Sequence, residues 1–136
     1  MSQQEVFQQL MKEKRRELTQ KFHALENTYQ KSEQRHQKLI EENNYAATRV
    51  LQYKSLKSHH ITVMQRLALI STGDQQSDER LHQYEEINVK PVDRELEKSE
   101  AIWQHADQAL RTFEKELVQI EDARNQIIQA IKSLSE

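Results

Sequence analysis

Histidine is the residue of this chain best suited to chemistry, and its spacing matches no known site. Six histidines occur. Three of them, His59, His60 and His82, are the candidates for a metal site, because a reversal of the chain would bring them near one another. Adjacent histidines on a helix point in different directions, and neither His-x3-His nor His-Glu-x2-His spacing occurs. We therefore expect solvated or interhelical histidines and no metal.

Carboxylates and glycines give no better prospect of catalysis. Paired acids such as Glu41-Glu42 and Glu85-Glu86 need a concave pocket to shift a pKa, and a thin helical protein offers none. One glycine cannot build a phosphate-binding loop or a nucleophile elbow, and the absence of cysteine excludes thiol chemistry. The sequence predicts a protein that is not an enzyme, with no catalytic residue and no cofactor.

The charge pattern bears on location and partners. Net charge is −2 with interleaved signs, so we expect no nucleic-acid partner. The short basic cluster Lys12-Glu13-Lys14-Arg15-Arg16 is diluted by acids and indicates a solvated face. No apolar run approaches the roughly 18 residues of a membrane span, and no apolar block follows the basic cluster as in a signal peptide. We expect no membrane insertion and a cytoplasmic location.

Composition and periodicity together predict a long helical pair. Apolar residues make up only 35% of the chain, against about 45–50% in an ordinary globule, which suits a single seam between two helices. Alternating steps of three and four residues mark two seam rows in the first half of the chain. One row holds Phe22, Tyr29, His36, Asn43, Val50, Lys57 and Met64, and the other holds Leu18, Leu25, Ser32, Leu39, Ala46, Tyr53, His60 and Leu67.

The second half repeats this pattern beyond the only proline, Pro91. Its rows hold Val92, Ser99, Ala106, Phe113, Ile120, Ile127 and Leu134, and Leu96, Trp103, Leu110, Leu117, Arg124 and Ile131. Leu81 and Tyr84 do not share this register, and proline removes a backbone donor. We therefore expect the second helix to be kinked or interrupted near Pro91.

The only glycine, Gly73, marks the turn between the halves. It suits the C′ position behind the first helix, and Asp74 or Ser77 can cap the next one, while Ser2 and Glu5 fit a capping box at the start. The prediction is all-α: a long antiparallel two-helix coiled-coil hairpin forming one domain over 1–136. Arm 1 covers about 3–70, the reversal covers 71–77 and arm 2 covers about 78–134.

Packing is expected to be uneven along the seam. Phe22, Leu25 and Ile120 are apolar in the terminal half, whereas polar residues such as His36 and Asn43 interrupt the seam elsewhere. Polar seam residues cost stability and help to fix register. We therefore expect the terminal half of the hairpin to be better packed than the middle.

Apolar residues outside the seam gather toward the reversal and indicate a partner surface. Exposed apolar clusters mark binding sites, although a local third helix or a dimer contact would also cover them. The predicted partner-binding residues are Leu51, Ile61, Val63, Leu69, Ile70, Tyr84 and Ile87.

These features resemble the stalk proteins of bacterial type III export machines, the FliJ / YscO (SctO) family. The likeness lies in the length, the absent cysteine, the Gln/Glu/Lys/Arg-rich arms and one reversal near 70–77. The resemblance implies a shaft without catalytic residues, seated in a hexameric export ATPase and linking it to the export gate protein. Its partners would hold it at the cytoplasmic face of the inner membrane.

Two other functions fit the same pattern. A wide apolar stripe on arm 2, with Ile102, Ala109, Ala123 and Ala130 beside the seam, would suit a homodimer that forms a four-helix bundle. A holdase-like chaperone that clamps its clients between or beside the arms is the third hypothesis.

Overall fold

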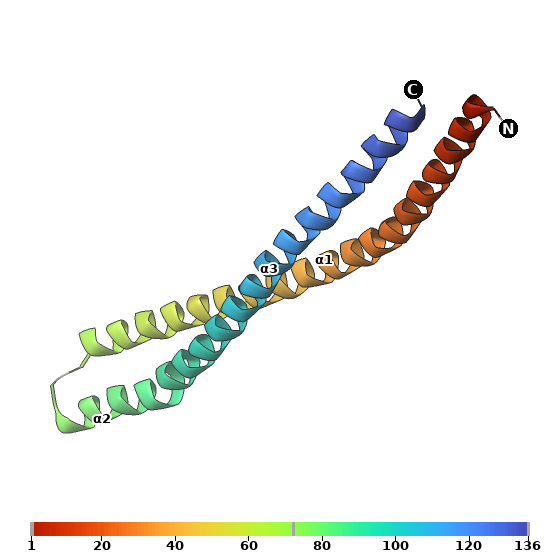
Figure 1. Ribbon diagram of the computed structural model, residues 1–136. Helices are drawn as coiled ribbons and strands as arrows, with labels where there is room; N and C mark the ends of the chain where they lie inside the picture. Colours follow the sequence, from red (N-terminus) through yellow and green to blue (C-terminus); the bar gives the residue numbers. More distant parts are fainter. Residues whose placement is uncertain (1, 72, 136) are drawn as a thin grey trace. The chain divides into compact units, whose positions relative to one another are not determined.

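The computed structural model describes residues 2–71 and 73–135, which are almost entirely helical (Figure 1). Helix α1 spans Gln3–Leu69, and α2 spans Gln75–Tyr84. A single π-helical turn, η1, covers Glu85–Val89 and leads directly into α3, Lys90–Ser135. No strand occurs in the described ranges. The predicted all-α antiparallel helical hairpin is confirmed.

The helix ends follow the expected capping chemistry, with one difference. The Ser2 hydroxyl accepts the Glu5 backbone N–H at 3.1 Å, and the Asp74 carboxylate accepts the Ser77 backbone N–H at 2.7 Å. Both bonds satisfy donors that a helix leaves unpaired in its first turn. Gly73 has a left-handed φ of 76°, as glycine readily does. Because α1 ends at Leu69, this glycine serves the entry to α2 and not the C′ position of α1.

The chain divides into two compact units, each of which contains an antiparallel pair of helical segments. Unit 1 combines Met1–Leu39 with Leu110–Glu136, and unit 2 is Ile40–Ala109. Unit 2 contains the reversal together with α2 and η1, whose ribbon lies beside the last turns of α1 (Figure 1). Every residue that the heptad analysis assigned to a seam row is buried or half-buried, so the predicted register holds in both units.

The best-buried side chains lie in unit 2, contrary to the expectation that the terminal half packs better. Those less than about a tenth exposed in unit 2 are Ala46, Val50, Val89, Val92, Leu96 and Ser99, whereas unit 1 has Phe113 and Leu117. The expected terminal core residues Phe22, Leu25 and Ile120 are only half-buried. We attribute the difference to small side chains such as Ala46 and Ser99, which allow helices to approach closely.

The expected interruption before Pro91 takes the form of the π-turn η1, and the chain stays helical through it. The Lys90 N–H donates to the carbonyl of Glu85, five residues back, which adds one residue to the turn. That extra residue reconciles the seam positions of Leu81 and Tyr84 with those of Val89 and Val92. The wider turn also accommodates a proline, whose ring would crowd the carbonyl four residues back in an α-helix.

Candidate interaction surface

Polar seam residues in unit 1 have partners on the opposite helix. Arg124 Nε lies 2.6 Å from Glu26 Oε2, and the Arg124 guanidinium also lies 4.8 Å from the centre of the Tyr29 ring. A planar guanidinium can bind a carboxylate and cover an aromatic face together. Tyr29 has a raised pKa, chiefly because its hydroxyl hydrogen-bonds to the Glu33 carboxylate. The two Arg124 contacts join α3 to α1 and favour one register of the two helices.

His36 is the least satisfied polar residue of the unit 1 seam. Its ring stacks on Phe113 with 6.1 Å between centroids, and its Nε2 atom lies 3.8 Å from Glu114 Oε2. That separation falls within ion-pair range but is too long for a hydrogen bond, so the buried Nε2 atom has no hydrogen-bond partner in the described structure. His36 therefore contributes to packing more than to polar pairing.

Unit 2 pairs its polar seam residues in the same manner. Asn43 Nδ2 donates to Asp107 Oδ1 at 3.1 Å, and Lys57 Nζ lies 2.5 Å from Asp93 Oδ1. The neighbouring Asp93 carboxylate raises the pKa of Lys57, because it stabilises the protonated amine. These pairs connect α1 to α3 at successive levels and help to fix the alignment of the two helices.

Polar groups also brace the π-turn. His60 Nδ1 and the Tyr84 hydroxyl share a hydrogen bond of 2.8 Å across the two helices. Asn88 donates from its side chain to the Tyr84 carbonyl at 3.3 Å, where the helix widens. Glu86 and Lys90 form an ion pair along the turn, and this pair lowers the pKa of Glu86 and raises that of Lys90.

Beside this braced segment lies a groove between the end of α1 and the α2–η1 segment, which we call the reversal groove. Its volume is about 490 Å³, and most of its surface is apolar. The residues that line it are Ile61, Met64, Gln65, Ala68, Leu81, His82, Glu85 and Val89. Of the titratable groups in this lining, one is a carboxylate and one is an imidazole, and neither Lys nor Arg is among them.

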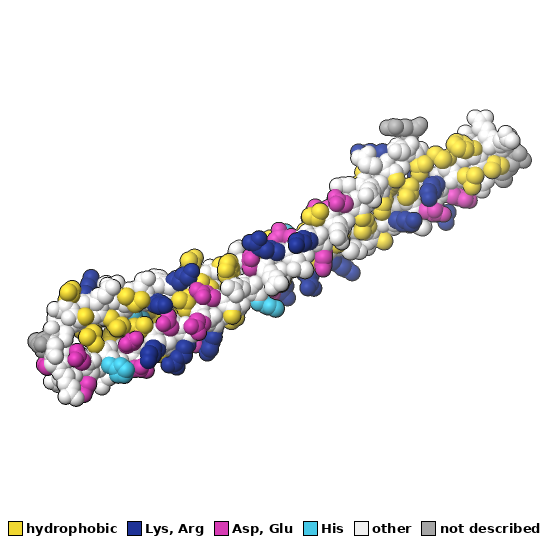
Figure 2. All heavy atoms as spheres, turned by 60° about the vertical axis from the view of Figure 1, so that its left-hand side comes forward, with side chains coloured by type: hydrophobic (Ala, Val, Ile, Leu, Met, Phe, Trp, Pro, Cys, Tyr) yellow, Lys and Arg dark blue, Asp and Glu magenta, His cyan; other side chains and the backbone are white. Residues whose placement is uncertain are grey.

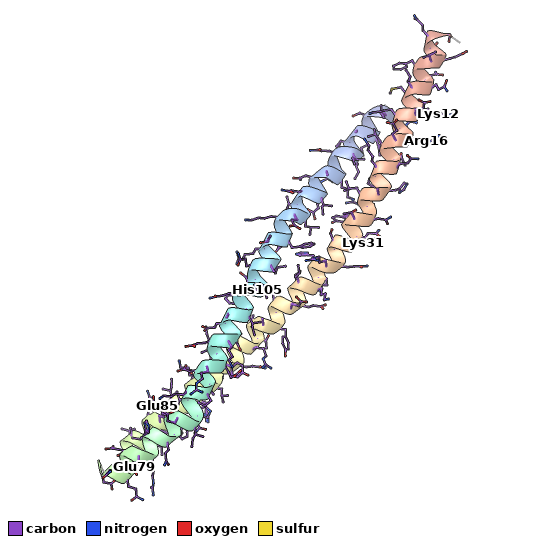
Figure 3. All side chains as sticks on the ribbon, turned by 60° about the horizontal axis from the view of Figure 1, so that its bottom comes forward. Lys12, Arg16, Lys31, Glu79, Glu85 and His105 are labelled. Carbon is purple, nitrogen blue, oxygen red and sulfur yellow. The ribbon has the colours of Figure 1, made fainter. Side chains whose placement is uncertain are left out.

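The surroundings of the reversal groove are acidic. Residues 61–90 contain five acids against three bases, and the base nearest η1, Lys90, is already paired with Glu86. Glu79 and Glu85 project from the segment that follows the reversal (Figure 3). Figure 2 shows apolar side chains at this end of unit 2 interleaved with acidic, basic and histidine side chains. The groove therefore combines a mostly apolar surface with one carboxylate, Glu85, and no Lys or Arg in its lining.

The seven predicted partner-binding residues do not form one continuous patch. Leu69, Ile70 and Ile87 are strongly exposed, at 85%, 75% and 70%. Leu51 is exposed in a shallow depression on the outer side of α1, whereas Ile61 lines the reversal groove. The remaining two, Val63 and Tyr84, are half-buried, and Tyr84 is bonded to His60.

Sequence reasoning named only one of the residues that line the groove, Ile61, as a partner-binding residue. Met64 belongs to a predicted row, and Leu81 stands at the position where the register changes. A groove forms there because Ala68 is too small to fill the space between the helices. An alanine between two leucines near the reversal, Ala68, is the sequence signal that would have identified it.

A second, smaller groove of about 290 Å³ lies farther along unit 2. Its floor includes the buried Ala46 and Ser99, and exposed Tyr45 and Ile102 stand at its edges. Arg49 lies 5.9 Å from the Tyr45 ring centre and is thereby held against α1. Of the wide stripe predicted on arm 2, Ile102 and Ala109 are exposed, whereas Ala123 and Ala130 are half-buried.

The N-terminal turns of α1 extend beyond the end of α3. Arg15 Nη2 donates to the Leu134 carbonyl at 2.8 Å, near the last residues of α3, and residues 2–10 are exposed throughout. Val6, Phe7 and Leu10 are 43%, 62% and 59% exposed. Figure 3 shows Lys12 and Arg16 on these turns.

The three histidines considered for a metal site contact other side chains and do not converge on one point. His59 and His60 have ring centroids 5.5 Å apart, His60 is bonded to Tyr84, and His82 lies 4.0 Å from Glu86. Across the described ranges, no group of three or more His, Cys, Asp or Glu residues could hold a metal ion.

Comparison with protein-family models finds no match, and neither do comparisons with curated proteins and with solved structures. In the part of the chain that the structure describes, no helix is both long enough and apolar enough to cross a membrane.

Proposed function

We propose that this chain is a non-enzymatic coiled-coil stalk of a bacterial type III export apparatus, coupling the export ATPase ring to the export gate. One observation carries the proposal. Large apolar side chains are exposed around the reversal, although the seam is already filled by its own rows. A protein that exposes Leu69, Ile70 and Ile87 at one end of a helix pair is built to contact other proteins there.

The polar seam supports the same proposal. Paired groups such as Lys57–Asp93 and Asn43–Asp107 fix the register of the helices with little apolar burial. A shaft that transmits movement between partners needs a defined register and only a thin core. The resemblance to the FliJ / YscO family supplies the identity of the two partners.

The direct test is capture of both partners by a tagged chain from the cells that express it. Mass spectrometry should identify a hexameric export ATPase and the export gate protein. Recovery of copies of the chain alone would contradict the stalk and favour the scaffold.

A triple serine variant tests which surface carries this function. Leu51→Ser, Leu69→Ser and Ile87→Ser should leave helicity intact, since all three side chains are exposed. Capture of the ATPase or gate should fall at least about tenfold, because each buried aliphatic side chain contributes roughly 1.5–3 kcal/mol to an interface. Circular dichroism and capture are measured on one preparation.

The matched control places serine at three exposed polar positions of unit 2, Lys54, Gln83 and Gln104. This variant should retain both helicity and capture. Loss of helicity in the apolar triple variant would show that those residues belong to the core, and unchanged capture would remove the surface from the proposal.

A self-associating scaffold is the second candidate, and the smaller groove favours it. Exposed Tyr45 and Ile102 flank small, buried Ala46 and Ser99, so a second copy could approach closely there. In that case sedimentation would show a dimer that Ile102→Ser dissociates.

A further inference from the structure

Two surfaces of the molecule are left uncovered, the reversal groove and the first turns of α1. The reversal groove runs between two antiparallel segments and has an apolar floor. The first turns of α1 have no α3 segment beside them and expose Val6, Phe7 and Leu10. These turns continue a long helix but leave three large apolar side chains in water, so covering them would be favourable.

We infer that residues 3–17 of a second copy of this chain dock in the reversal groove. The groove lies at the same end of the helix pair as the exposed Leu69, Ile70 and Ile87, but these three residues do not line it, and the inference does not depend on the ATPase and gate contacts. It makes the chain a partner for itself, through two different surfaces.

Shape supports this docking. An amphipathic helix in a groove uses anchors spaced by three, four and seven residues, and Phe7 and Leu10 with Lys14 have that spacing on one face. In the heptad numbering of α1 these residues stand outside the rows that face α3, so they do not simply continue the intramolecular seam. The small Ala68 side chain in the groove allows an incoming helix to approach closely.

Charge supports it as well. The cluster 12–16 has four bases and one acid, all exposed, whereas the groove lining contains Glu85 and no Lys or Arg. Opposite potentials favour association and set orientation. Lys14, one turn beyond Leu10 on the same face, is the base best placed to meet Glu85. Contact between two reversal grooves is disfavoured, because it would bring two Glu85 carboxylates together with no Lys or Arg in either lining.

The contact joins two different surfaces, so repeating it links copies of the chain into a closed ring or an open filament. Sedimentation equilibrium of the full chain should therefore show reversible, concentration-dependent association. A fluorescein-labelled peptide of residues 2–17 should bind the full chain with rising anisotropy.

Two substitutions test the groove with a matched control. Ala68→Glu places a charge in the groove, and Ala101→Glu places the same charge on an exposed alanine of α3. Ala68→Glu should weaken both association and peptide binding at least tenfold, which is about the effect of losing one aliphatic anchor. Ala101→Glu should change neither, and circular dichroism should show equal helicity.

A charge exchange tests the partner. Glu85→Lys and Lys14→Glu should each weaken association about threefold to tenfold, and the two together should restore it, as a double-mutant cycle detects. A chain that stays monomeric at every concentration overturns the inference. Association that is insensitive to Ala68→Glu, or equally lost in Ala101→Glu, also overturns it. Capture of an export ATPase is a separate measurement, so failure of either proposal leaves the other distinguishable.

Discussion

At the scale of single residues, the seam between α1 and α3 contains several polar pairs among its apolar contacts. Asn43 meets Asp107, Lys57 meets Asp93 and Arg124 meets Glu26, each across the two helices. A hydrogen-bonded pair tolerates only a small shift of one helix along the other, whereas aliphatic rows tolerate several registers. Polar residues in the seam weaken the coiled-coil pattern of the sequence. The same residues define how α1 and α3 align.

The Lys57–Asp93 pair predicts a particular response to alkali. The folded-state pKa of Lys57 is raised above its ordinary value of 10.5, so its contribution is fully present below that pH and is lost as pH rises through the folded value. Lys57→Met should reduce the loss of stability above about pH 10.5. Urea unfolding at a series of pH values measures it, and parallel curves for the variant and the native chain would contradict the prediction.

At the scale of elements, burial concentrates where small residues bring the helices together. Leu96 in unit 2 is 8% exposed, whereas Leu25 in unit 1 is only half-buried. The two leucines occupy comparable seam positions, so they form a matched pair of sites for truncation.

Leu96→Ala should destabilise the protein by about 2–5 kcal/mol, since a buried leucine leaves a cavity. Leu25→Ala should cost about half as much, because its side chain already contacts water. Thermal and urea unfolding of both variants give the comparison. Equal costs would show that the terminal helices pack as tightly as those of unit 2.

The π-turn is an element with a register function. It adds one residue between the seam positions of α2 and those of α3, so removing one residue should convert it into ordinary α-helix. Deletion of the exposed Ile87 together with Pro91→Ala should preserve the fold and its stability within about 1 kcal/mol, an ordinary surface effect.

A deletion in regular helix is the control for this prediction. Deletion of the exposed Ala101 would rotate every later α3 residue out of the seam and should unfold unit 1 or lower its melting temperature sharply. Amide hydrogen exchange locates the effect in each variant. If both deletions are equally harmful, the register role of η1 is wrong.

At the scale of the whole molecule, the two units share the same helices but pair different segments of them. Cysteine pairs test both pairings, one at Leu25 and Ala123 in unit 1 and one at Ala46 and Ser99 in unit 2. A short bifunctional thiol reagent should crosslink each pair within one chain, as mass spectrometry of the denatured product would show. Crosslinks found only between chains would replace the hairpin with an exchanged dimer.

The sequence by itself determined the helices, their seam rows and most of their ends. Heptad spacing follows from the geometry of an α-helix, and capping by Ser2 and Asp74 depends on residues only three positions away. The break in register before Pro91 was also visible, because it depends on spacing alone. The exposed apolar residues near the reversal could be identified as candidates, since they stand outside the rows.

Tertiary structure alone decided how these features combine. The π-turn absorbs the extra residue because α2 and α3 must both keep their apolar rows against α1. The reversal groove exists because Ala68 leaves space beside Met64 and Leu81, and that space depends on side chains far apart in sequence. The tighter burial in unit 2 depends on small residues of opposite helices meeting at the same level, as Ala46 and Ser99 do. Pairings of this kind involve two segments that are distant in the sequence, and the spacing of residues within one helix does not predict which residues face each other across two helices.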